Sequence, residues 1–137
     1  IQQGRVDDLF ERPVSEFTAQ FVGMKNLSKF RPGEDCLYLG EDPGIRVVPA
    51  RMPGPDARTM GIRPEDIGLD IHGAGFENRF PAKITHISSQ GMFLNVGLEM
   101  NGVCLEAVWP RSYFKDHGLA EGGQVVVGFH PRAVHSF

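Results

Sequence analysis

The sequence predicts a mainly β protein, in which a small antiparallel β-barrel follows one or two N-terminal helices. After Gly23, apolar and polar residues alternate in many short runs, which is typical of strands with one buried face. Stretches rich in glycine and proline separate these runs, as turns between strands would. Before Gly23 the apolar residues follow a helical period instead. We expect the strands to curl into a barrel, because an open sheet would leave its edges unpaired.

The N-terminal part of the chain, residues 1–24, is predicted to be a helical tail and linker. Its apolar stripe is formed by Val14, Phe17 and Phe21, which are spaced i, i+3 and i+7. Gly23 follows as a C-terminal cap. Two short helices cannot cover this stripe for each other, so we interpret the segment as the end of a larger, preceding domain.

The remainder, residues 25–137, is predicted to form the barrel. Its alternating runs fall into two sets, and one helical turn at 112–117 interrupts the second set. We expect strands at 36–39, 45–48, 59–63, 81–87, 92–98, 103–109 and 125–129.

The two sets end in related heptapeptides. GIRPEDI at 61–67 aligns without a gap on GFHPRAV at 128–134. In this G-x-x-P unit the glycine permits close backbone approach or a bulge, and the proline turns the chain away from the sheet. Each set also opens near an asparagine, Asn26 in the first and Asn78 in the second. The pattern predicts an internal duplication. We place its halves at about 25–72 and 73–137.

Composition and charge argue against DNA binding and against a membrane-spanning segment. The 137 residues, 41% of them hydrophobic, are enough for one core. Fourteen basic against 17 acidic residues give a net charge of -3, so the long-range field does not favour DNA as a partner. No run approaches the roughly 20 apolar residues of a membrane span. Cys36 and Cys104 are isolated, which favours buried thiols in a reducing compartment.

Two motifs in a fixed order carry a family resemblance. R-V-D-D-L-F-E-R-P-x-S-E-F-T-A-Q-F-V-G at 5–23 precedes M-G-I-R-P-E-D-I at 60–67. This order resembles the C-terminal half of the ATP-binding subunits of bacterial and archaeal ABC importers. In those subunits the last helices of the nucleotide-binding domain lead into an OB-type barrel called the TOBE domain. The family signature falls on Gly61, Arg63, Pro64, Glu65 and Asp66.

The resemblance also implies partners and a location. It implies a homodimer formed through this region, permease subunits in the membrane, and a place on the cytoplasmic side of the inner membrane. ATP and Mg would belong to the nucleotide-binding domain, so no cofactor is expected in this fragment. We expect no catalytic residues, because the sequence lacks the G-x-x-x-x-G-K-[ST] phosphate loop. We expect no metal site either, because the five histidines lack ligand spacing.

Within this family, the second half resembles the molybdate-binding, or Mop-type, modules. The resemblance rests on V-W-P-R-S at 108–112, G-L at 118–119 and E-G-G-Q-V at 121–125. Glu77 stands where those modules have an arginine. The implied ligand is an oxyanion such as molybdate or tungstate, which needs several convergent hydrogen-bond donors. The candidate donors are Asn78, Lys83, Ser88, Ser89, Arg111 and Ser112.

Other interpretations stay open. Residues 88–91 also fit an ordinary hairpin turn, and Ser112 fits an ordinary helix cap. After molybdate or tungstate, the alternative is a TOBE domain of an importer for sulfate, ferric iron, a sugar or a polyamine, with a purely structural role. A further alternative is an OB-type module for single-stranded nucleic acid, in which Trp109, Tyr113 and Phe114 form a stacking platform.

Overall fold

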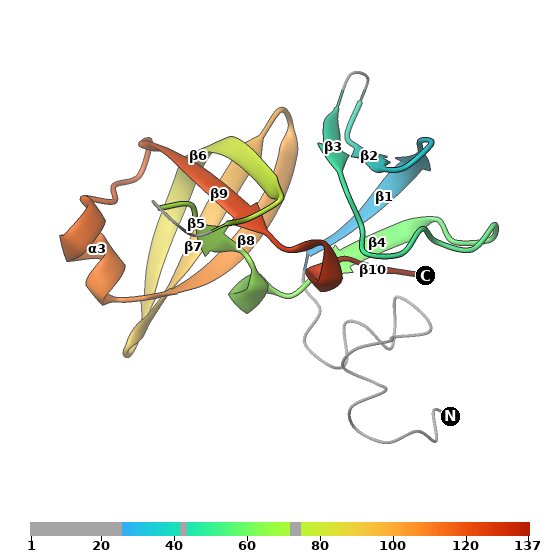
Figure 1. Cartoon of the computed structure of the whole chain (residues 1–137). Coiled ribbons are helices and arrows are strands. Elements are labelled where there is room, and N and C mark those ends of the chain that lie inside the picture. Colours follow the sequence, from blue (N-terminus) through green and yellow to red (C-terminus); the bar gives the residue numbers. More distant parts are fainter. Residues whose placement is uncertain (1–25, 42–43, 72–74) are drawn as a thin grey trace, which may run out of the picture.

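A computed structural model describes residues 26–41, 44–71 and 75–137 (Figure 1). The predicted helical tail, residues 1–24, lies outside this part. The described residues form two five-stranded antiparallel sheets with a single short α-helix, so the predicted mainly β class is confirmed.

The first sheet has the strand order β10-β4-β1-β2-β3. Its strands are β1 (Asn26–Pro32), β2 (Leu37–Leu39), β3 (Ile45–Val47), β4 (Thr59–Ile62) and β10 (His135–Ser136). The alternation of the sequence gives β2 and β3 their buried-exposed-buried or buried-intermediate-buried pattern. The sequence did not predict β1, whose outer residues are mostly polar.

The second sheet has the strand order β5-β9-β6-β7-β8 and is strongly twisted (Figure 1). Its strands are β5 (Gly68–Leu69), β6 (Asn78–Gln90), β7 (Phe93–Met100), β8 (Val103–Pro110) and β9 (Gln124–Phe129). The predicted helical turn is α3 (Ser112–His117), between β8 and β9. It ends as expected at Gly118, whose φ of 62° is a left-handed conformation that glycine adopts without strain.

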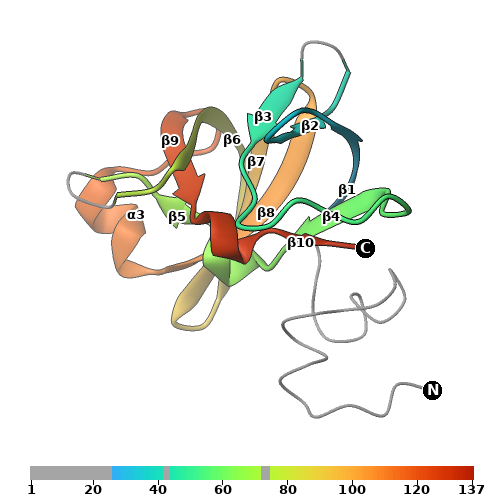
Figure 2. The same ribbon diagram turned by 45° about the vertical axis from the view of Figure 1, so that its right-hand side comes forward.

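The two sheets exchange their last strands. β4 runs through a 3-10 turn, η1 (Pro64–Asp66), into β5, which pairs with β9 of the other sheet. Likewise β9 runs through η2 (Pro131–Ala133) into β10, which pairs with β4. Both turns lie side by side at the centre of the molecule (Figure 2). The repeated G-x-x-P unit therefore marks each crossing, and the proline at the start of each turn ends the preceding ladder.

Two buried asparagines reinforce the exchange. The Asn78 carboxamide, at the start of β6, accepts a hydrogen bond from Val48 N at 2.7 Å and donates to Val48 O at 2.9 Å. The Asn26 carboxamide, at the start of β1, accepts from Glu106 N at 2.7 Å and donates to Glu106 O at 2.8 Å. Asn78 thus binds backbone groups just after β3, and Asn26 binds backbone groups within β8, the outermost strand of the other sheet in each case. The same strand order and the same asparagine contact occur twice, as a duplicated chain would have them, while the boundaries 25–72 and 73–137 stay a prediction.

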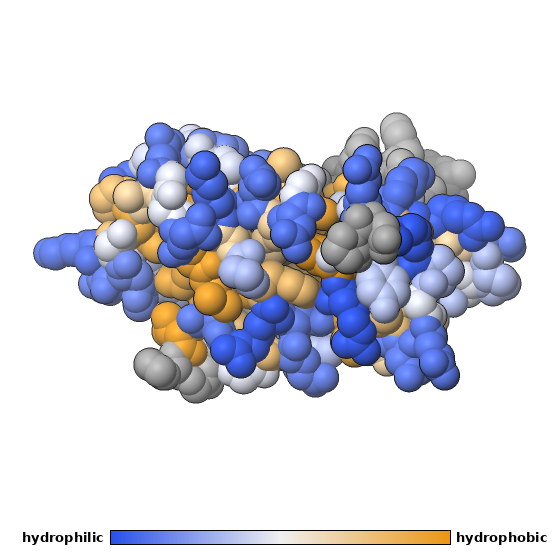
Figure 3. Space-filling view, turned by 90° about the horizontal axis from the view of Figure 1, so that it is seen from above, coloured by the Kyte–Doolittle hydropathy of each residue, from blue (hydrophilic) through white to orange (hydrophobic). Residues whose placement is uncertain are grey.

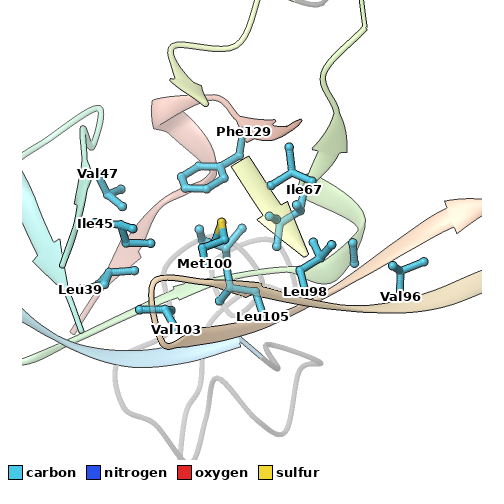
Figure 4. Packing of buried hydrophobic residues seen from close by; sticks show 14 of the residues in the cluster. Leu39, Ile45, Val47, Ile67, Val96, Leu98, Met100, Val103, Leu105 and Phe129 are labelled. Carbon is cyan, nitrogen blue, oxygen red and sulfur yellow. The ribbon is translucent and has the colours of Figure 1, made fainter. Parts of the chain in front are cut away.

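One hydrophobic cluster joins both sheets (Figure 4). Leu39 and Val47 of the first sheet and Val96 and Phe129 of the second have no exposed surface. Full burial of such a side chain stabilises the fold by about 1.5–3 kcal/mol. The shared core explains why two sheets of short strands form one unit.

The two cysteines differ in environment. Cys36 is buried, as predicted, whereas Cys104 is exposed. The prediction of a buried thiol was wrong for Cys104 because β8 alternates, and Val103 and Leu105 on either side take the inward positions.

Candidate anion-binding site

A groove beside α3 brings together three of the predicted oxyanion ligands. Its volume is about 540 Å³. It is lined by Ile87, Ser89, Leu94, Arg111, Ser112, Phe114 and Lys115. We call it the α3 groove. Its floor is apolar, and its polar groups are two hydroxyls and two cations, with no carboxylate among the lining residues.

Local contacts fix the guanidinium of Arg111 in this groove. Its Nε donates a hydrogen bond to Gly91 O at 2.9 Å, and its Nη2 donates to the Ser89 hydroxyl. The backbone N of Arg111 also donates to Met92 O at 2.9 Å. These bonds tie the start of α3 to the turn between β6 and β7, so the cation is held in place before any ligand arrives.

The structure corrects one interpretation of Ser112. Arg111, not Ser112, occupies the cap position of α3, and no side chain caps that helix. Ser112 is the first helical residue, and its exposed hydroxyl lines the groove. Ser89 belongs to β6, while the turn itself is formed by Gly91 and Met92.

The other three predicted ligands do not join the α3 groove. A strand rises about 3.3 Å per residue, so Asn78 lies on the order of 30 Å from Ser89 along β6. Its carboxamide is already engaged with Val48. Lys83 is exposed and lies opposite Glu99 of β7, which places an anion beside it. Ser88 is a neighbour of Ser89 and points to the other face of the sheet.

The residues of the family signature occupy the first crossing. Gly61 is buried in β4, where it pairs with His135, and Pro64 is buried at the start of η1. Arg63 Nη1 lies 3.3 Å from His135 Nε2. Glu65 and Asp66 point outward. Although Asp66 is exposed, partial burial of its carboxyl raises the pKa, and the nearby Glu65 raises this pKa further, while Arg63, His135 and Arg132 oppose the shift.

The sequence did not single out a second, larger cleft at the crossings. Its volume is about 790 Å³, and it is lined by η1, η2, β10 and the loop 50–54. One sequence feature could have indicated this cleft, namely the basic residues of the repeat. Arg63 and His130 hold the same position in the two heptapeptides, and Arg132 lies two residues after His130.

The proposed nucleic-acid platform does not form. Trp109 is only 2% exposed, and its Nε1 donates to Ile67 O at 2.8 Å inside the core. Its ring packs against Tyr113 with centroids 6.2 Å apart. A base could not stack on an indole buried in this way.

The described residues lack a metal-ligand cluster and a membrane-spanning helix. No three His, Cys, Asp or Glu side chains within residues 26–41, 44–71 and 75–137 gather as a metal ion would require. In the same described part, no helix has the length and apolar character needed to cross a bilayer.

Two sheets that exchange their last strands, a shared core and a groove with two cations define a small β module whose surface can bind an anion. The chain belongs to the TOBE domain family, whose model matches residues 60–137. It is 32% identical over 139 residues to the molybdate/tungstate import ATP-binding protein WtpC of Pyrococcus horikoshii, covering 100% of this chain and 39% of that protein. The chain therefore spans well under half the length of this relative.

Two further comparisons extend this result. The Fe(3+) ions import ATP-binding protein FbpC of Escherichia coli O157:H7 is 32% identical over 103 residues, which cover 74% of this chain and 28% of that protein. A crystal structure of the cytoplasmic molybdate-binding protein ModG with molybdate bound matches with a TM-score of 0.65 and 13% identity, covering 82% of this chain and 95% of ModG. The ModG likeness shows the fold, and it confirms the predicted Mop-like architecture.

Proposed function

We propose that this chain is the C-terminal regulatory domain of the ATP-binding subunit of an ABC importer and that it senses an oxyanion of the molybdate or tungstate class. The observation that carries the proposal is the match of the whole chain to a molybdate/tungstate import subunit. ATP and Mg would bind in a preceding nucleotide-binding domain. The subunit would work on the cytoplasmic side of the membrane, against permease subunits.

The α3 groove supplies the chemistry for such a ligand. A tetrahedral dianion needs several convergent donors, and each charge-assisted hydrogen bond contributes about 1.5–3 kcal/mol. The Arg111 guanidinium and the hydroxyls of Ser89 and Ser112 face the same groove, and Lys115 adds a second cation. Bonds to Gly91 and Ser89 already orient the guanidinium, which lowers the entropy lost on binding.

Calorimetric titration of the 137-residue chain with tungstate, molybdate and sulfate tests the proposal. We expect Arg111→Gln to weaken tungstate binding by about tenfold or more, because one charge-assisted contact is lost. Arg46→Gln is the matched control, since Arg46 is exposed on β3 outside the groove. Absence of binding by all three anions would leave a purely structural role, and equal losses in the two variants would rule out the α3 groove.

A second candidate is a TOBE domain from an importer of another solute. The similarity to the FbpC protein, over 74% of this chain, favours ferric iron among the alternatives. In such an importer the domain would contribute only packing and dimer contacts. If the chain binds none of the three oxyanions but still forms a dimer, this candidate is supported.

A further inference from the structure

The cleft between the turns η1 and η2, where the chain crosses from one sheet to the other, resembles a small-molecule binding site in its lining. Its walls are η1, η2, the strand β10 and the loop 50–54. The backbone N of Ala50 donates to Pro131 O at 3.1 Å, which fastens the loop to η2. The pairing of His135 with Gly61 fastens β10 to the first sheet. We call this space the crossing cleft.

Positive charge is concentrated in the crossing cleft. Arg51, Arg63 and Arg132 line it, and Asp66 is the carboxylate among its lining residues. The whole chain has the opposite sign, with a net charge of -3. Charges of one sign gathered in a concave surface attract a counter-ion far more strongly than the same charges spread over a surface.

Asp66 lines the same cleft as Arg63, His135 and Arg132. Arg63, His135 and Arg132 each lower the pKa of the Asp66 carboxyl, although burial and Glu65 raise the pKa by more. Side chains from η1, η2 and β10 are therefore within Coulombic range of one point at the edge of the cleft. Arg51 and Arg132 are exposed and can reach toward a ligand without unfolding a wall.

The size of the cleft selects the class of anion. Its volume of about 790 Å³ is within the range of about 300–1,000 Å³ that holds drug-sized ligands. A single tetrahedral oxyanion would contact only part of such a space. An extended anion with several charged oxygens can contact both Arg51, on the loop 50–54, and Arg132, on the adjoining η2, and guanidinium groups bind phosphate oxygens in pairs.

We propose that the crossing cleft binds a polyphosphate chain, either inorganic or carried by a nucleotide. This site is separate from the α3 groove, so it goes beyond the oxyanion proposal and stands independently of it. Arg51 and Arg132, from two adjoining segments of the cleft lining, contact neighbouring phosphates of the chain. Asp66 opposes them and weakens the binding.

Calorimetry on the 137-residue chain with inorganic triphosphate, ATP and inorganic phosphate tests this inference. We expect triphosphate to bind, and Arg51→Gln and Arg132→Gln to weaken it by about tenfold each. Asp66→Asn should have the opposite effect and tighten binding several-fold, because it removes a repulsive charge. Raising the salt concentration should weaken all these affinities, since the walls are exposed.

Control variants separate the crossing cleft from general attraction. Arg46→Gln should leave triphosphate affinity within about twofold, and Arg111→Gln should weaken tungstate alone. Equal affinity for ATP and triphosphate would assign recognition to the phosphate chain, whereas tighter ATP binding would assign it to the nucleotide. The proposal fails if triphosphate does not bind, if inorganic phosphate binds as tightly, or if Arg46→Gln weakens binding as much as Arg132→Gln. Circular dichroism of each variant checks that the fold is retained.

Discussion

At the scale of single residues, Asn78 fits two roles in the sequence, that of an anion ligand and that of a structural hydrogen-bonding residue. An asparagine at the start of a Mop-like strand suggests a ligand for an oxyanion. In the structure its carboxamide acts as a backbone mimic, because it pairs with both the N–H and the C=O of Val48. Asn26 does the same with Glu106. A buried carboxamide in this position satisfies strand-edge groups that would otherwise lose their hydrogen bonds.

We expect Asn78→Ala to lower the free energy of unfolding by about 2–4 kcal/mol, because two hydrogen bonds are lost and the Val48 N–H and C=O become unsatisfied. Urea unfolding followed by circular dichroism measures this loss. Ser88→Ala on the same strand is the control, since Ser88 is exposed and its change should stay within about 0.5 kcal/mol. A loss as small as that of the control would show that the Val48 pairing contributes little to stability.

At the scale of elements, the G-x-x-P unit combines two requirements. Its proline ends a strand and starts a 3-10 turn. Its glycine in the second crossing is needed for a close approach, because a Cβ on Gly128 would lie 2.7 Å from both Asn78 O and Phe76 Cβ. The Phe76 ring in turn packs on His130 with centroids 5.0 Å apart. The predicted role of the proline is confirmed in both crossings, and close approach at the glycine is confirmed at Gly128.

Gly128→Ala is expected to destabilise the protein by about 1–3 kcal/mol, because the backbone oxygen of Asn78 cannot yield as a flexible side chain could. Gly54→Ala is the matched control, since a Cβ there meets nothing within 4 Å. Thermal unfolding of both variants provides the comparison. If the two melting temperatures fall together, the close packing at Gly128 is not what constrains this position.

The elements also show what sequence reasoning could and could not provide. Apolar alternation predicted β2, β3, β7 and β8, whose inward residues build the core. It predicted only 81–87 of β6, which runs from Asn78 to Gln90, because the run Ser88, Ser89 and Gln90 at its end has no apolar alternation. The two-residue strands β5 and β10 carry no period at all. Their exchange depends on contacts distant in sequence, and so does the separation of Asn78 and Lys83 from the α3 groove.

At the scale of the whole molecule, large apolar side chains are exposed mainly around the second sheet. Met92 is 81%, Phe93 52% and Phe114 49% exposed. Seen from above, further apolar side chains gather over the half of the molecule that holds the second sheet, among hydrophilic ones (Figure 3). Clusters of this kind mark interaction surfaces in soluble proteins. They support the proposed homodimer, in which a second copy would cover them.

We expect the double variant Met92→Ser, Phe114→Ser to weaken self-association by about tenfold or more, because apolar area is lost on both partners. Light scattering after gel filtration over a range of concentrations measures the dimer constant. Met52→Ser is the control, since Met52 is 37% exposed and lines the crossing cleft instead. If the 137-residue chain without substitutions stays monomeric at the highest concentration, the proposed dimer is contradicted.

The strand exchange has a consequence for how such a module can change over time. β5 belongs to the sheet of the later half, and β10 belongs to the sheet of the earlier one. Neither half can be deleted, replaced or shuffled into another gene without removing a strand from what stays behind. Each half therefore completes the sheet of the other, and a change in β4 or β9 is felt in both sheets.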